Sequence, residues 1–152
     1  MKTILVLYHS QGGTMDGMAH RFARGAAREE EVVVSLKRAQ DATLDDLLRC
    51  DAIAIGSPEY FGTMAGMIKD FFDRTFQAAQ DQTIGLPFVL FVCAGNDGRG
   101  AISTVRSAAT VLIRAAMRSM SSCPIPAVGS SSSSISGSSE RVVAISSARL
   151  RP

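Results

Sequence analysis

Short apolar runs, each followed at once by glycine, serine or proline, constrain the fold of this chain more than any other feature. Three of them, residues 4–8, 52–56 and 87–94, dominate the first two-thirds of the sequence, and residues 32–36 form a fourth. Continuous runs of this length, rich in β-branched and aromatic residues, are typical of strands buried on both faces of a parallel sheet. The sequence therefore predicts four such strands.

Helical patterns separate these runs. Apolar residues recur with a 3.6-residue period over residues 15–26, 64–72 and 102–116, and residues 44–48 make a short amphipathic turn. Strands and helices alternate along the chain, which is typical of an α/β fold with right-handed crossovers between strands. We therefore expect a doubly wound parallel sheet with helices on both faces, in three layers.

The last part of the chain differs in composition from the rest. Thirteen of the 29 residues from 119 to 147 are serine. We expect residues 1–118 to form the folded core, with residues 119–152 as a Ser-rich segment that is either disordered or part of the same domain. Residues 141–145 are the candidate fifth strand, and residues 123–128 compete for that place.

Length and charge narrow the function classes. The chain has 152 residues, the length of one domain, and its longest apolar stretch, residues 86–94, is far shorter than the roughly 20 residues of a spanning helix. Residues 1–98 carry a net charge of −4 and residues 99–152 one of +6, for a total of +2. The basic part lacks interleaved aromatic residues. We expect a cytoplasmic protein that binds neither membrane nor nucleic acid.

The cysteines predict neither disulfides nor a metal centre. Cys50, Cys93 and Cys123 are odd in number and far apart, and His9 and His20 are the only histidines. Structural zinc sites need closely spaced ligand pairs. We interpret all three cysteines as buried, reduced thiols.

The loop after the first strand has the composition of a phosphate-binding loop. Its glycines allow a tight turn, its hydroxyls can donate, and the following helix N-terminus favours an anion. The candidate residues are Ser10, Gln11, Gly12, Gly13 and Thr14. An ordinary strand-to-helix turn with Thr14 as N-cap explains the same residues equally well.

Two further loops follow the next strong strands. Tyr60 and Phe61 are adjacent directly after a buried strand, where exposed aromatics usually have a flat ligand over them, although a hydrophobic staple is the alternative. Residues 93–100 contain three glycines and small polar residues that can line a ligand with backbone groups. Because the carboxyl ends of parallel strands share one edge, the three loops predict a site for a mononucleotide with an aromatic headgroup.

Two elements resemble the flavodoxin-like superfamily, in particular the FMN-dependent NAD(P)H:quinone oxidoreductases of the Trp-repressor-binding-protein type. They are Ser10-x-x-Gly13-Thr14 and the segment 56–66 that continues into residues 68–75. The resemblance covers roughly residues 1–118 and implies the strand order 2-1-3-4-5.

The resemblance also implies FMN as the cofactor. Residues 10–14 would hold its phosphate. The isoalloxazine ring would be lined by Pro58, Tyr60, Phe61, Gly62, Thr63 and Met64, with Ala94, Gly95, Asn96 and Gly98 on the other rim. The activity would be hydride transfer from NAD(P)H to a quinone or similar small-molecule acceptor, in a homo-oligomer.

Side-chain acid–base catalysis is not expected at this site. We interpret His9 and His20 as structural and Glu59 as facing solvent, close enough to the proposed flavin ring to influence its potential. A flavodoxin-type electron carrier and a degenerate, non-catalytic flavodoxin-like module remain alternatives. The net charge of +2 favours an enzyme over the carriers, which are usually strongly acidic.

Overall fold

The computed structural model describes residues 1–114 and the strand at residues 141–147. Along the chain the elements are β1 (Lys2–Tyr8), α1 (Thr14–Ala26), β2 (Val32–Arg38), α2 (Leu44–Arg49), β3 (Ala52–Tyr60), β4 (Thr63–Met64), α3 (Gly66–Ala79), β5 (Phe88–Ala94), α4 (Arg99–Arg114) and β6 (Arg141–Ser147). The four predicted strands and the alternating helices are confirmed.

The sheet has the order β2-β1-β3-β5-β6, and the two-residue β4 pairs with β3 outside this path. Without β4 the strand order is 2-1-3-4-5, as the resemblance implied. Strands β1, β2, β3 and β5 pair in parallel, but β6 runs antiparallel to β5. The sheet is therefore mixed rather than wholly parallel. A strand at the end of a sheet pairs on one side only, so the apolar pattern does not determine its direction, and antiparallel edge strands are common on such sheets.

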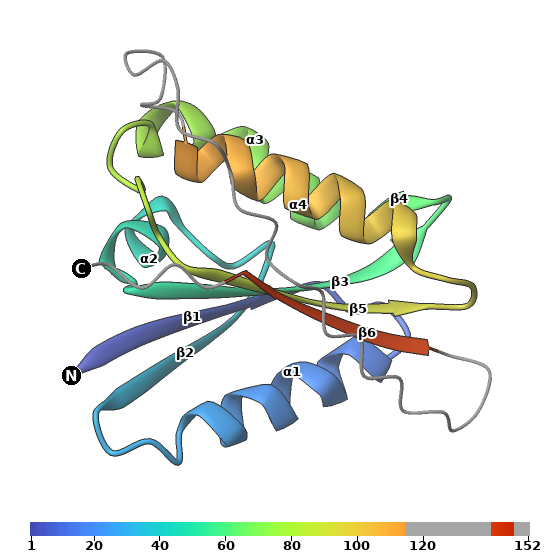
Figure 1. Ribbon diagram of the computed structural model, residues 1–152, viewed down its shortest axis with the longest axis horizontal. Coiled ribbons are helices and arrows are strands. Elements are labelled where there is room, and N and C mark those ends of the chain that lie inside the picture. Colours follow the sequence, from blue (N-terminus) through green and yellow to red (C-terminus); the bar gives the residue numbers. More distant parts are fainter. Residues whose placement is uncertain (115–140, 148–152) are drawn as a thin grey trace.

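Helices cover both faces of the sheet, in the three predicted layers. Helix α1 lies on one face, and α2, α3 and α4 lie on the other (Figure 1). Successive residues of β1 serve opposite faces: Leu5 and Leu7 belong to the core cluster with α2–α4, whereas Val6 and Tyr8 belong to the cluster with α1. This alternation explains why the strand is apolar without interruption.

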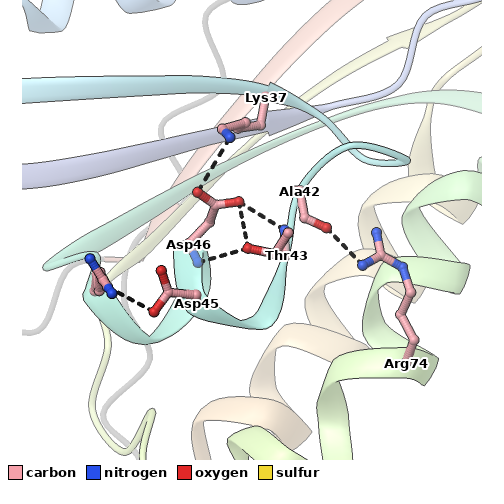
Figure 2. Close-up of polar contacts among 7 residues, drawn as sticks. Lys37, Ala42, Thr43, Asp45, Asp46 and Arg74 are labelled. Carbon is pink, nitrogen blue, oxygen red and sulfur yellow. Dashed lines mark hydrogen bonds and ion pairs between the residues drawn. The ribbon is translucent and has the colours of Figure 1, made fainter.

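Helix α2 has only six residues and depends on its N-terminal cap. The Thr43 hydroxyl accepts a hydrogen bond from the Asp46 amide at 3.2 Å, and the Asp46 carboxylate accepts one from the Thr43 amide at 2.8 Å (Figure 2). Lys37 of β2 lies 3.5 Å from the same carboxylate. Arg74 of α3 donates to the Ala42 carbonyl at 2.7 Å, which holds the β2–α2 connection against α3. A reciprocal capping box of this kind stabilises a helix too short to form alone.

Several further predictions concern the interior and the end of the chain. Cys50 and Cys93 are buried, as predicted, and burial raises the pKa of the Cys50 thiol to about 11. Cys123 and the competing strand at residues 123–128 lie outside the described residues, whereas the candidate at residues 141–145 lies within β6. The division of the chain at residue 118 stays a prediction. In the described part of the chain, no helix is long and apolar enough to cross a membrane.

Candidate functional site

Residues 10–14, the phosphate loop, connect the carboxyl end of β1 to α1. Gly13 adopts a left-handed backbone with φ of 91°, and its amide donates to the Ser10 hydroxyl oxygen at 3.2 Å. Gly13 is the N-cap of α1 and makes no side-chain cap hydrogen bond, so the alternative with Thr14 as N-cap is wrong. The reason is geometric, since the chain turns into the helix at Gly13 and Thr14 is already its first residue. A helix start without a side-chain cap leaves its first amides available to an anion.

Asp16, a carboxylate in the first turn of α1, is paired with neighbouring polar and cationic groups. Asp16 accepts hydrogen bonds from the Tyr8 hydroxyl at 2.8 Å and from the Arg38 guanidinium at 3.0 Å. These partners lower the pKa of Asp16, the Tyr8 hydrogen bond most strongly, while burial is the main cause that raises the pKa of Tyr8. The pairing offsets the repulsion that a free carboxylate would exert on a bound phosphate.

The second predicted loop is a β-hairpin, which we call the 58–64 hairpin. Strand β3 continues to Tyr60, and Glu59 and Tyr60 pair with Met64 and Thr63 of β4. Phe61 and Gly62 form the two-residue turn of the hairpin, with φ of 51° and 71°. Positive φ at both central residues is typical of such hairpin turns. Strand β3 extends beyond its apolar stretch because β4 provides hydrogen-bonding partners for its last residues, Glu59 and Tyr60.

The loops enclose a cavity of about 420 Å³ at the carboxyl edge of the sheet, within the usual size range of small-molecule sites. All three predicted segments contribute to it. The lining residues are Ser10, Gln11, Gly12, Thr14, Met15, Pro58, Glu59, Tyr60, Cys93, Ala94 and Gly95. Among the described residues, no cluster of His, Cys, Asp or Glu could hold a metal ion.

The other predicted residues do not line this cavity. They are Gly13, Phe61, Gly62, Thr63, Met64, Asn96 and Gly98. Phe61 is fully exposed at the hairpin tip and Met64 is buried in the core, so the pleat and the turn carry these side chains away. Gly13 and Gly98 act through backbone conformation, since both have positive φ. Contact of the predicted residues with FMN stays a prediction.

Three lining residues were not among the predicted cofactor contacts: Met15, Glu59 and Cys93. Met15 and Cys93 were assigned to the core, where they also belong. The expectation that Glu59 faces solvent is wrong, because it is half-buried and accepts a hydrogen bond from the Ala101 amide at 3.1 Å. Its position immediately before Tyr60 was the available signal.

His9 packs beside the aromatic wall of the cavity. Its ring lies edge-on to Tyr60, with centroids 6.3 Å apart. Burial lowers the pKa of His9, and the nearby Arg38 guanidinium lowers it further. A neutral imidazole packed against an aromatic ring fits the structural role expected for His9.

Comparison with known proteins places the chain in a family. Residues 10–129 match the model of the NADPH-dependent FMN reductases, which spans the phosphate loop, the hairpin and the third loop. The chain belongs to the NADPH-dependent FMN reductase family. Membership confirms the resemblance seen in the sequence, from which FMN and NAD(P)H were inferred, and the name of this family contains FMN and NADPH.

Curated relatives of the chain are named as NAD(P)H dehydrogenases (quinone). The "NAD(P)H dehydrogenase (quinone)" of Paracoccus denitrificans strain Pd 1222 is 33% identical over 138 residues, covering 77% of this chain and 66% of the relative. The "NAD(P)H dehydrogenase (quinone) 3" of Rhizobium meliloti strain 1021 is 31% identical over 138 residues, covering 77% and 65%. The chain thus spans just under two-thirds of the length of these two relatives.

Solved structures confirm the flavodoxin-like fold. A flavodoxin from the domain Archaea aligns with a TM-score of 0.51 and 28% identity, covering 57% of this chain and 58% of that one. A WrbA-like flavodoxin from Agrobacterium tumefaciens aligns with a TM-score of 0.57 and 23% identity, covering 73% and 71%.

Proposed function

We propose that this member of the NADPH-dependent FMN reductase family binds FMN in the cavity and transfers hydride from NAD(P)H to a quinone-like acceptor. The observation that carries the proposal is the cavity itself, in which the α1 N-terminus, uncapped by any side chain, and an aromatic wall line one space. A phosphate needs the first feature and a flavin ring the second. The names of the curated relatives support the choice of donor and acceptor.

The donor set fits FMN. The backbone of residues 10–14 and the hydroxyls of Ser10 and Thr14 would hold the phosphate without any lysine. The ring would lie between the hairpin wall at Pro58 and Tyr60 and the opposite rim at residues 94–95. When bound, FMN supplies the hydride and electron chemistry. The protein orients the reactants and excludes water, and we assign no side chain as general acid or base.

The proposal extends to assembly and location. We propose a homo-oligomer with closed symmetry, the arrangement that most soluble oligomers have. The buried, free thiol of Cys50 supports a reducing, cytoplasmic location.

The first test is the visible absorbance spectrum of the purified protein, taken before and after incubation with FMN and desalting. A retained flavin spectrum is expected, with FMN held more tightly than riboflavin because only FMN carries a phosphate. A spectrum without flavin after reconstitution would contradict the proposal and favour a degenerate, non-catalytic module.

The second test separates an enzyme from an electron carrier, the alternative favoured by the likeness to an archaeal flavodoxin at 28% identity. The reconstituted protein should oxidise NADH or NADPH rapidly with a soluble quinone as acceptor. If it retains FMN but NAD(P)H reduces it only slowly, the carrier is the better reading. The formal net charge of +2 favours the enzyme.

A further inference from the structure

Glu59 joins two walls of the cavity that are far apart in the sequence. Glu59 lies at the end of β3 and is one of the residues that line the cavity. Its carboxylate accepts a hydrogen bond at 3.1 Å from the amide of Ala101, in the first turn of α4. The chain reaches α4 directly from the opposite rim at residues 94–95, so this contact links the rim to the hairpin.

The charge of Glu59 suits this place. The first turn of α4 contains no acidic residue of its own. A carboxylate near a helix N-terminus stabilises the positive end of the helix dipole and satisfies an amide that has no intrahelical partner. Here another element, β3, supplies that carboxylate.

Close backbone contact reinforces the Glu59 contact. A Cβ atom on Gly100 would lie 1.8 Å from the Gly62 carbonyl oxygen and 2.9 Å from a Glu59 carboxylate oxygen. Farther along α4, the Thr104 hydroxyl oxygen accepts from the Met64 amide at 2.9 Å. The hairpin is therefore docked on α4 at its base, at its turn and along β4.

We propose that Glu59 is a positioning residue, whose hydrogen bond to Ala101 sets the spacing between Tyr60 on the hairpin wall and the rim at residues 94–95. The consequence for ligand affinity rests on the proposed function, that is, on FMN occupying this cavity. Glu59 acts through the two walls and takes no part in the chemistry. Without the Glu59 hydrogen bond, the hairpin could move relative to α4, and the isoalloxazine ring of FMN could then occupy a wider range of positions.

Two substitutions separate the hydrogen bond from the charge. Glu59→Gln keeps an oxygen acceptor of nearly the same reach, whereas Glu59→Ala removes the contact. The dissociation constant for FMN should stay within about threefold of wild type in Glu59→Gln and rise about tenfold in Glu59→Ala, as expected for the loss of a hydrogen bond to a charged group. Glu30→Ala is the matched control, because Glu30 is exposed and does not line the cavity. This variant should bind FMN like wild type.

Rescue by glutamine is the decisive readout. If Glu59→Gln binds FMN as weakly as Glu59→Ala, the charge rather than the position matters and the proposal is overturned. Wild-type affinity in Glu59→Ala would overturn it too.

Amide hydrogen exchange tests the contact without any cofactor. In the FMN-free protein, the Ala101 amide should exchange about tenfold faster in Glu59→Ala than in wild type, with Glu59→Gln in between. Equal exchange in Glu59→Ala and wild type would show that the contact does not hold α4. If wild type binds no FMN yet the exchange rates differ as expected, the proposed function fails while the coupling of hairpin and helix stands.

Discussion

The phosphate loop and the 58–64 hairpin face the same cavity but are built in opposite ways. The loop rests on local geometry, namely the positive φ of Gly13 and a hydrogen bond spanning three residues, from Gly13 to Ser10. The hairpin rests on distant partners, since Glu59 and Met64 both contact α4, about forty residues later.

This difference separates the effects of substitution in the two walls. A change in the loop should alter the backbone where it occurs and little else. A change in the hairpin or in the first turn of α4 should also alter the relation between two elements and cost more stability. Four substitutions test the comparison, and they are given in order of decreasing expected effect.

Gly100→Ala should have the largest effect, because the new methyl group would overlap the Gly62 carbonyl oxygen, 1.8 Å away. We expect the free energy of unfolding, measured with urea, to fall by about 2–3 kcal/mol, as for overpacking of a close contact. Gly17→Ala is the matched control, since it lies within α1 with no atom within 4 Å of the added Cβ. It should stabilise the protein by up to about 1 kcal/mol, the difference in helix propensity. Similar values for the two variants would show that the hairpin is not docked on α4.

Gly13→Ala should come next, and its effect should be local. A side chain there has open space but must adopt φ of 91°, which costs about 1–2 kcal/mol. Unfolding stability should fall by this amount, and FMN affinity should fall with it. Gly12→Ala is the control, because Gly12 has equal space and no positive φ. If Gly12→Ala lost as much stability as Gly13→Ala, the positive φ of Gly13 would not be the cause of the loss.

Tyr60→Ala tests the aromatic wall, with its neighbour Phe61 as the matched control. We expect the dissociation constant for FMN to rise about tenfold in Tyr60→Ala, since stacked aromatic contacts and their buried area contribute about this much. Phe61 is fully exposed and does not line the cavity, so Phe61→Ala should leave affinity unchanged. Fluorescence titration with FMN measures both. An equal loss of FMN affinity in the two variants would show that Phe61 contacts FMN, as the sequence predicted.

Asp46→Ala should have the smallest effect and leave the site alone. Removing one half of the α2 capping box should lower the unfolding free energy by about 1 kcal/mol, with no change in FMN affinity. Burial opposes ionisation of Asp46, but hydrogen bonds from Thr43 and the Lys37 ammonium outweigh it and lower the pKa below its ordinary value of 3.8. This stabilisation is present above the unfolded-state pKa and is lost as the pH falls through the folded-state pKa. The difference between variant and wild type should therefore shrink on acidification. A difference independent of pH would show that the carboxylate charge does not contribute.

The sequence determined the fold class and most strands because their signals are local. The run at residues 4–8 is apolar at every position, as expected of a strand that is covered on both faces. In the structure Leu5 packs on one face of the sheet and Val6 on the other. The direction of β6 was not predictable, because an edge strand can pair either way.

Within the site, the sequence by itself determined that a glycine-containing loop at residues 10–14 leads from β1 into α1, because the glycines and the helix start are encoded by adjacent residues. Only the tertiary structure decided that Glu59 contacts α4 and that Phe61 is fully exposed at the hairpin tip. Those outcomes depend on Gly100 and Ala101, which meet the hairpin only after the sheet and α4 have packed. A contact between residues forty positions apart leaves no periodicity or spacing in the sequence from which it could be inferred.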